Sequence, residues 1–161
     1  MSISFSGSEL INIAIGVERR GIAFYDIMTR STENAITRDI FQYLADMERE
    51  HIQIFQGMLA EVDKYQIPET YAQEYASYLQ ALVDNAVFTD DMVTSEMATK
   101  AESDIEALEL AIGAEKDSIL FYYEIKEIMP QRAQATINKI ITEEKSHLRQ
   151  LSGLKKNLIA P

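Results

Sequence analysis

The chain has 161 residues, a length typical of one domain, and its 47% hydrophobic and 25% charged residues are those of a folded globular protein. Its formal net charge of −11 disfavours binding to nucleic acid and to anionic membrane surfaces. The sequence contains no cysteine, which excludes disulfides, iron–sulfur clusters and thiol catalysis within these 161 residues.

The N-terminus reads MSISFSGSELINIAIG and has neither a basic region nor a small-residue cleavage site. No apolar run approaches the roughly 18 residues that a membrane span needs. We therefore expect a cytoplasmic protein with no membrane partner and no nucleic-acid partner, folded as a single domain over residues 1–161.

Apolar residues recur with helical spacing in four long segments. The first predicted helix runs from about Gly7 to Arg30, and Ser6 and Glu9 have the spacing of a capping box at its start. The second runs from about Glu33 to Tyr65. Only a few residues separate these two helices, so we expect them to pack as an antiparallel hairpin.

The third predicted helix starts near Ser103, where Ser103 and Glu106 again have capping-box spacing, and it ends before Pro130. The fourth runs from about Gln131 to Asn157 and forms a second hairpin with the third. Between the hairpins, residues 66–102 are long enough for a parallel crossover, in which Pro68 can open a short helix. The predicted fold is all-α: a ferritin-like four-helix bundle of two antiparallel hairpins joined by a long crossover.

The two hairpins also resemble each other in sequence. Residues 15–25 read IGVERRGIAFY and residues 112–122 read IGAEKDSILFY, with six of eleven positions identical. Farther on, Glu48-Arg49-Glu50-His51 is echoed by Glu144-Lys145-Ser146-His147. Two matches in the same order indicate a duplicated helical hairpin.

Six side chains that can bind metal lie on the apolar stripes of the four helices rather than on their charged faces. They are Glu18, Glu48, His51, Glu115, Glu144 and His147. Burying unpaired carboxylates is costly, and the stripes contain no Lys or Arg to neutralise them. One Glu from each of two helices, with Glu-x-x-His from each of the other two, is the ligand set of di-iron and di-manganese sites in helical bundles.

Charge and spacing support this metal hypothesis. Residues i and i+3 share a helix face, so each Glu-x-x-His pair can reach one ion, and four carboxylates balance two divalent cations. Glu143 competes with Glu144 as a ligand, but the repeat pairs Glu144 with Glu48 and Glu143 with Met47, so we choose Glu144. Mixed carboxylate and imidazole ligands suit two iron ions, with manganese as the alternative.

Tyr25 and Tyr122 each follow a predicted ligand glutamate by seven residues on the same stripe. Two interpretations stay open for them. Each is either a phenol that hydrogen-bonds a ligand carboxylate or an ordinary core tyrosine.

At these residues the chain resembles the rubrerythrin branch of the ferritin-like superfamily. The resemblance covers all four helices and implies a carboxylate-bridged, non-haem di-iron centre, often in a homodimer. It implies an oxidoreductase that reduces hydrogen peroxide or dioxygen, or one that oxidises ferrous iron.

The chain departs from the usual rubrerythrin pattern at two points. Typical members carry a rubredoxin module with Cys-x-x-Cys pairs, whereas this sequence has no cysteine, so electrons would come from a separate donor, possibly a rubredoxin-like one. Rubrerythrins usually have a further glutamate at the position of Ser118, and the six remaining ligands look more like those of bacterioferritin. Ferrous-iron handling and a non-catalytic bundle stapled by metal therefore stay as alternatives to peroxide or dioxygen reduction.

Overall fold

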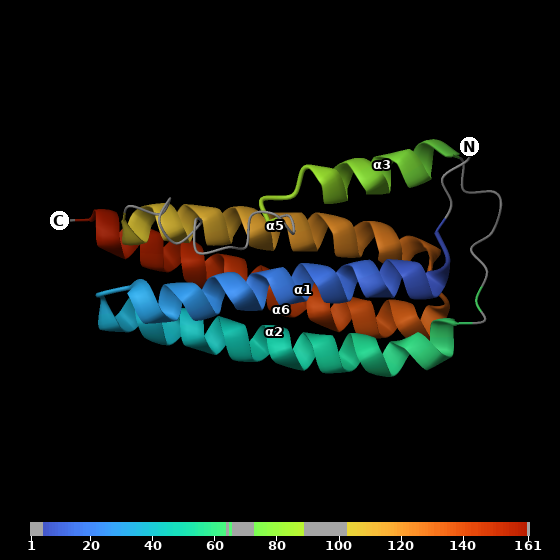
Figure 1. Cartoon of the computed structure of the whole chain (residues 1–161), viewed down its shortest axis with the longest axis horizontal. Coiled ribbons are helices and arrows are strands. Elements are labelled where there is room, and N and C mark those ends of the chain that lie inside the picture. The colour runs from blue at the N-terminus through green and yellow to red at the C-terminus, as the bar shows by residue number, and fades with distance from the viewer. Residues whose placement is uncertain (1–4, 64, 66–72, 89–102, 161) are drawn as a thin grey trace.

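The computed structural model describes residues 5–63, 65, 73–88 and 103–160 (Figure 1). These residues form five helices and, within those ranges, no strand. The helices are α1 (Gly7–Ser31), α2 (Ala35–Val62), α3 (Gln73–Asp84), α5 (Asp104–Ile128) and α6 (Gln131–Ile159).

Polar side chains define where the helices begin. Ser6 Oγ accepts a hydrogen bond from the Glu9 backbone N–H at 3.1 Å, and Glu9 Oε2 accepts from the Ser6 N–H at 3.0 Å, which completes the predicted capping box of α1. Ser103 Oγ accepts from the Glu106 N–H at 3.2 Å at the start of α5. The predicted start of α2 at Glu33 was two residues early, because Asn34 caps the helix by accepting from the Thr37 N–H at 3.0 Å.

The four long helices run side by side, and α3 lies outside them along α5 (Figure 1). Helix α1 packs antiparallel to α2, and α5 packs antiparallel to α6. Helices α2 and α5 point in the same direction, so the connection between them is a crossover and not a short turn. The predicted all-α bundle of two hairpins with a long crossover is confirmed. Helix α3 is the described part of the short helix predicted in that crossover, and residues 66–72 lie outside the described residues.

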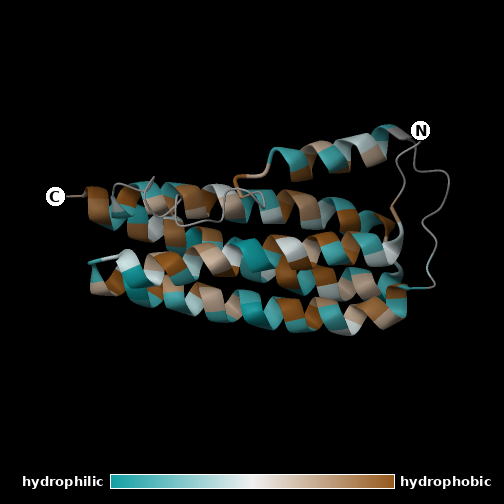
Figure 2. Cartoon of the chain, in the orientation of Figure 1, coloured by the Kyte–Doolittle hydropathy of each residue, from teal (hydrophilic) through white to brown (hydrophobic). Residues whose placement is uncertain are grey.

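The hydrophobic core has two parts that lie toward opposite ends of the bundle. One contains Leu10, Phe55 and Ile137, and the other contains Phe24, Phe41 and Leu151. Hydrophobic and hydrophilic residues alternate around each long helix, as expected of helices that bury one face (Figure 2). Along the stripes, the six predicted ligands fall between the residues of these two clusters.

Within the described ranges, no helix combines the length and the apolar character needed to cross a lipid bilayer.

Candidate metal centre

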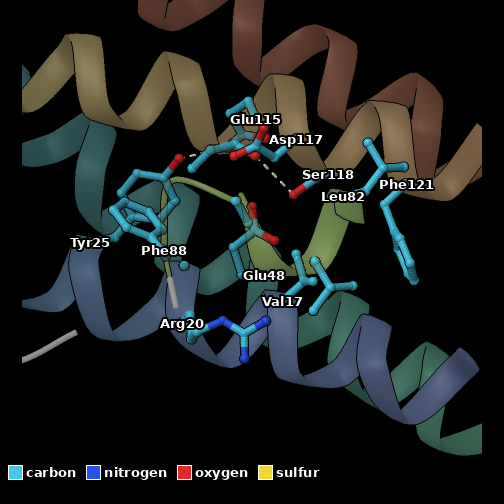
Figure 3. A pocket seen from close by; sticks show the side chains of 14 residues that line it. Val17, Arg20, Tyr25, Glu48, Leu82, Phe88, Glu115, Asp117, Ser118 and Phe121 are labelled. Carbon is cyan, nitrogen blue, oxygen red and sulfur yellow. Dashed lines mark hydrogen bonds between the residues drawn. The ribbon is translucent and has the colours of Figure 1, made fainter. Parts of the chain in front are cut away.

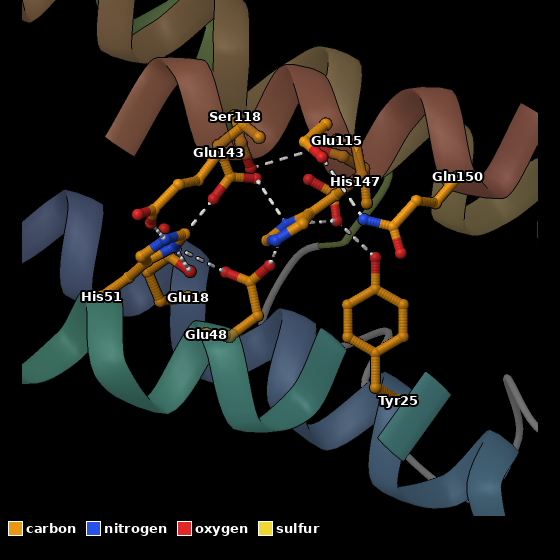
Figure 4. Close-up of polar contacts among 12 residues, drawn as sticks. Glu18, Tyr25, Glu48, His51, Glu115, Ser118, Glu143, His147 and Gln150 are labelled. Atoms are coloured by element: carbon orange, nitrogen blue, oxygen red, sulfur yellow. Dashed lines mark hydrogen bonds and ion pairs between the residues drawn. The ribbon is translucent and has the colours of Figure 1, made fainter. Parts of the chain in front are cut away.

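All six predicted ligands are buried at the middle of the bundle, and none exposes more than 4% of its surface. Helix α1 supplies Glu18 and α5 supplies Glu115, while α2 and α6 each supply a glutamate and a histidine one turn apart. The structure therefore brings the six side chains from four helices into one polar layer inside the apolar core (Figure 4).

The layer divides into two sets of four residues whose potential ligand atoms lie within 4.8 Å of one another. The first set is Glu18, Glu48, His51 and Glu144, and the second is Glu48, Glu115, Glu144 and His147. Glu48 and Glu144 belong to both sets. Two cations held in this way would share two carboxylates, which is the arrangement of a bridged two-metal site.

In the first set, the Nδ1 atom of His51 faces three carboxylates. It lies 2.8 Å from Glu144 Oε1, 3.4 Å from Glu48 Oε2 and 3.5 Å from Glu18 Oε2. The second set repeats this geometry around His147. Its Nδ1 lies 3.5 Å from Glu48 Oε1, 3.7 Å from Glu115 Oε1 and 3.9 Å from Glu144 Oε2. One nitrogen of each imidazole is thus aimed at the centre of its set.

Several of these buried atoms have no hydrogen-bond partner among the described residues. They are both oxygens of Glu144, one oxygen each of Glu18 and Glu115, and Nδ1 of His51 and His147. The 2.8 Å approach of His51 to Glu144 is short but lacks hydrogen-bond geometry. Unpaired polar atoms at this depth cost on the order of 1–3 kcal/mol each, and more when they are charged. A divalent cation in each set would bind these atoms, so the donor set fits a pair of metal ions.

The pKa values of the two histidines show that the buried carboxylates strongly stabilise positive charge at the centre. Burial alone would lower the pKa of His51, but Glu144 and Glu48 outweigh it and raise the pKa to about 11. Burial likewise would lower the pKa of His147, but Glu115 and Glu48 outweigh it and raise the pKa to about 9. Without metal, both imidazoles therefore hold an extra proton at neutral pH.

The pKa values of two neighbouring carboxyl groups, Glu144 and Glu115, are shifted in opposite directions. Burial, together with Glu115 and Glu48, raises the pKa of Glu144 well above its ordinary value. Burial also opposes ionisation of Glu115, but the nearby Glu144 and His147 and the hydrogen bond from Tyr25 outweigh it and lower its pKa. Ionisation of Glu144 is therefore less favourable than ionisation of Glu115, and the two carboxyl groups titrate as an interacting pair.

The two tyrosines bind ligand glutamates, but each binds the glutamate of the other hairpin. The Tyr25 hydroxyl on α1 donates to Glu115 Oε1 on α5 at 2.6 Å, and the Tyr122 hydroxyl on α5 donates to Glu18 Oε1 on α1. Burial, followed by the nearby carboxylates, raises the pKa of both phenols, so they remain protonated donors. Of the two interpretations left open by the sequence, this geometry supports a phenol that orients a ligand carboxylate.

Glu143 lies beside the centre rather than in either set. Its side chain is 44% exposed, and Glu143 Oε2 lies 2.6 Å from Nε2 of His51, the nitrogen that faces away from the centre. Our sequence analysis treated Glu143 only as a rival of Glu144 and missed this contact. No local signal marked this contact, because it joins residues 92 positions apart on two different helices.

A cavity of about 40 Å³ lies against the centre on the side covered by α3 (Figure 3). Glu48 and Glu115 are part of its wall, together with Arg20 and Asp117 and a larger number of apolar residues. One water occupies roughly 10–15 Å³ by this measure, so the cavity has room for a molecule of a few atoms. Sequence reasoning did not find it, because the segment after α3 that covers it has no periodic pattern.

That covering segment is attached to α5. The Val87 backbone N–H donates to Asp117 Oδ2 at 2.7 Å, and a Cβ atom added to Gly113 would lie 2.9 Å from Val87 Cγ2. Gly113 therefore allows the segment to approach α5 closely, and Asp117 holds it there.

The chain matches the family model for rubrerythrin over residues 9–155. It is also similar to a crystal structure of a Thermotoga maritima protein described as a ferritin-like diiron-carboxylate protein. The two chains are 34% identical, the match covers 94% of this chain and 95% of the other, and the TM-score is 0.70. Among curated proteins, none matches the chain. The family match and the similarity in sequence and structure together place this chain in the rubrerythrin family of ferritin-like proteins.

Proposed function

We propose that the six buried residues hold two iron ions and that the loaded protein is an oxidoreductase that reduces hydrogen peroxide or dioxygen. The observation that carries this proposal is the pair of overlapping four-residue sets with unpartnered atoms aimed at their centres. Mixed carboxylate and imidazole ligation suits iron, with manganese as the alternative metal.

Two ferrous ions held by these residues would supply two electrons, which with two protons would convert one hydrogen peroxide to two waters, or one dioxygen to hydrogen peroxide. The roles of the chain's own residues follow from their positions. Glu48 and Glu144 belong to both four-residue sets and would hold both ions, and the two phenols hold Glu115 and Glu18 in place. Because Ser118 has no carboxylate and its hydroxyl donates to the Ala114 carbonyl at 3.1 Å, it adds no further ligand.

The cavity supports a small oxidant as the substrate. Its volume of about 40 Å³ suits peroxide or dioxygen better than a bulky organic hydroperoxide. Its wall includes Glu48 and Glu115, so a molecule inside it lies next to the proposed metal ligands. These 161 residues contain no cysteine, so we propose that a separate protein returns the electrons.

The test is to load the protein with ferrous iron without oxygen and then mix it with each oxidant in a stopped-flow spectrometer. We expect two irons per chain and a rapid spectral change with peroxide, dioxygen or both. Glu115→Ala should abolish turnover, because it removes a ligand of the second set. Full activity in Glu115→Ala would refute the site, and a loaded protein inert to both oxidants would leave metal with a purely structural role.

A second candidate function is the oxidation of ferrous iron as a substrate. The formal net charge of −11 favours it, because an acidic surface attracts cations. Adding ferrous iron well beyond two per chain separates the candidates. Continued oxidation of the excess would support iron handling, whereas oxidation that stops at two irons per chain would support peroxide or dioxygen reduction.

A further inference from the structure

The two histidines are counterparts in the internal repeat, yet their outer nitrogens have different surroundings. His51 Nε2 lies 2.6 Å from Glu143 Oε2. His147 Nε2 is buried and has no hydrogen-bond partner in the part of the chain that the structure describes. The inner nitrogens do not differ in this way, since each Nδ1 faces three carboxylates.

The repeat explains the difference. An offset of 96 positions that aligns His51 with His147 also aligns Met47 with Glu143. A methionine thioether is a weak acceptor and does not replace a carboxylate. On α2, the ring of Tyr43 meets the His147 imidazole edge-on, with the centroids 6.2 Å apart. The α2 position that corresponds to Glu143 is thus a methionine, so α2 supplies no carboxylate there, whereas α6 places the Glu143 carboxylate against His51.

A carboxylate on the outer nitrogen changes what an imidazole can do for a metal. It accepts the Nε2 proton, which fixes the tautomer with the Nδ1 lone pair facing inward, and it increases the basicity of that lone pair. The 2.6 Å separation is that of a strong, charge-assisted hydrogen bond. Glu143 keeps 44% of its side chain exposed, so it provides this charge without full burial of a carboxylate.

We propose that the two metal positions are unequal, and that Glu143 is the positioning residue that makes them so. The position formed by Glu18, Glu48, His51 and Glu144 binds its ion first and more tightly than the position that contains Glu115 and His147. Partners of this kind change metal affinity by about 10- to 100-fold, which sets the size of the difference. This inference rests on the proposed binding of two metal ions.

The test is an anaerobic calorimetric titration of the metal-free protein with ferrous iron. Wild type should show two binding steps whose affinities differ by about 10- to 100-fold. Glu18→Ala should remove the tight step, and Glu115→Ala should remove the weak one, because each glutamate belongs to only one set. These two variants assign the steps to positions independently of catalytic activity.

Exchanging the residues at positions 143 and 47 then tests whether Glu143 causes the difference in affinity. Glu143→Met should weaken the tight step until the two steps merge, and Met47→Glu should tighten the weak step. The double variant should reverse which position fills first, an outcome that a purely structural role of Glu143 would not produce. Glu143→Gln keeps an acceptor for Nε2 and should show a smaller loss than Glu143→Met. Thermal unfolding of the metal-free variants checks that they are folded.

Two outcomes would overturn the inference, and they are distinguishable. Two equal steps in wild type, or equal weakening of both steps in Glu143→Met, would reject the inequality while leaving the two-metal centre intact. No binding of ferrous iron by the wild type would reject the metal centre itself.

Discussion

The α1–α2 hairpin and the α5–α6 hairpin each contribute one glutamate from the first helix and a glutamate with a histidine from the second. Each also contributes one tyrosine that binds the glutamate of the other hairpin. The positions beside these residues differ, however. Arg20 in α1 aligns with Asp117 in α5, and both line the cavity.

This comparison separates the residues that the metal centre requires from the residues that give each hairpin a role of its own. The residues that match between the hairpins include all of those whose atoms point at the proposed metal positions. The differing residues determine which half is covered and which half supports its histidine. Asp117 accepts the Val87 N–H, a bond that an arginine side chain could not accept, and this bond ties the covering segment to α5.

The largest effects are expected where the hairpins are most alike, at the shared glutamates. Metal-free and iron-loaded protein should differ in unfolding free energy by about 4 kcal/mol per filled position when free iron is about 1,000-fold above its Kd. Glu48→Ala and Glu144→Ala should each abolish this gain entirely, because each residue belongs to both sets. Calorimetric unfolding with and without iron measures it, and the exposed Glu50→Ala is the control. A gain that survives in either variant would mean that the sets are not shared.

The histidines should make the stability of the metal-free protein depend on pH. Their folded-state pKa values, about 11 for His51 and about 9 for His147, exceed the ordinary value of 6.5. Their stabilisation is therefore fully present below about pH 6.5 and lost as pH rises through the folded values. For His147 the loss is on the order of 3 kcal/mol, at about 1.4 kcal/mol per pKa unit.

Melting temperatures of the metal-free protein from about pH 6 to about pH 9 should show this decline. Iron-loaded protein should not show it, because ions rather than protons neutralise the carboxylates. Equal declines in both forms would point to groups outside the centre.

A smaller effect should distinguish two glycines at equivalent positions of the hairpins. Gly113→Ala would place a Cβ atom 2.9 Å from Val87 Cγ2, whereas at Gly16 the nearest such atom is the flexible Arg20 guanidinium at 3.3 Å. Gly113→Ala should destabilise the protein by about 1–3 kcal/mol or displace the covering segment. Gly16→Ala is the matched control and should be neutral or slightly stabilising. Denaturant unfolding gives the change in unfolding free energy for both variants. Equal changes would contradict the close contact between Val87 and Gly113.

The smallest predicted effects concern the phenols. Tyr25→Phe and Tyr122→Phe each remove one hydrogen bond to a ligand glutamate, and each should cost about 1 kcal/mol of metal-free stability. Similar losses in the two variants would support equivalent roles in the two hairpins. A loss confined to one variant would show that only one of the two bonds matters for stability.

The sequence predicted the bundle and the convergence of the six residues because both depend on helical periodicity, which is local. The caps at Ser6 and Asn34 also act locally, although only the first was identified. The cross-pairing of the tyrosines was not predicted. Tyr25 lies about 10 Å along the helix from Glu18, beyond hydrogen-bond reach, so its partner had to come from a neighbouring helix that periodicity cannot specify.

For the same reason the sequence did not predict the contact between Glu143 and His51 or the hydrogen bond from Val87 to Asp117 on α5. Each joins segments that are distant in the sequence, and no local pattern marks the pair. The homodimer, the cytoplasmic location and the separate electron donor concern the protein's surroundings and remain predictions.

Neither hairpin could assemble either four-residue set alone, because every set draws on both. Two independent hairpins would have to meet in solution before a cation could be held. The chain between Val62 and Asp104 turns that encounter into an intramolecular one, with an effective concentration fixed by its length instead of by expression level.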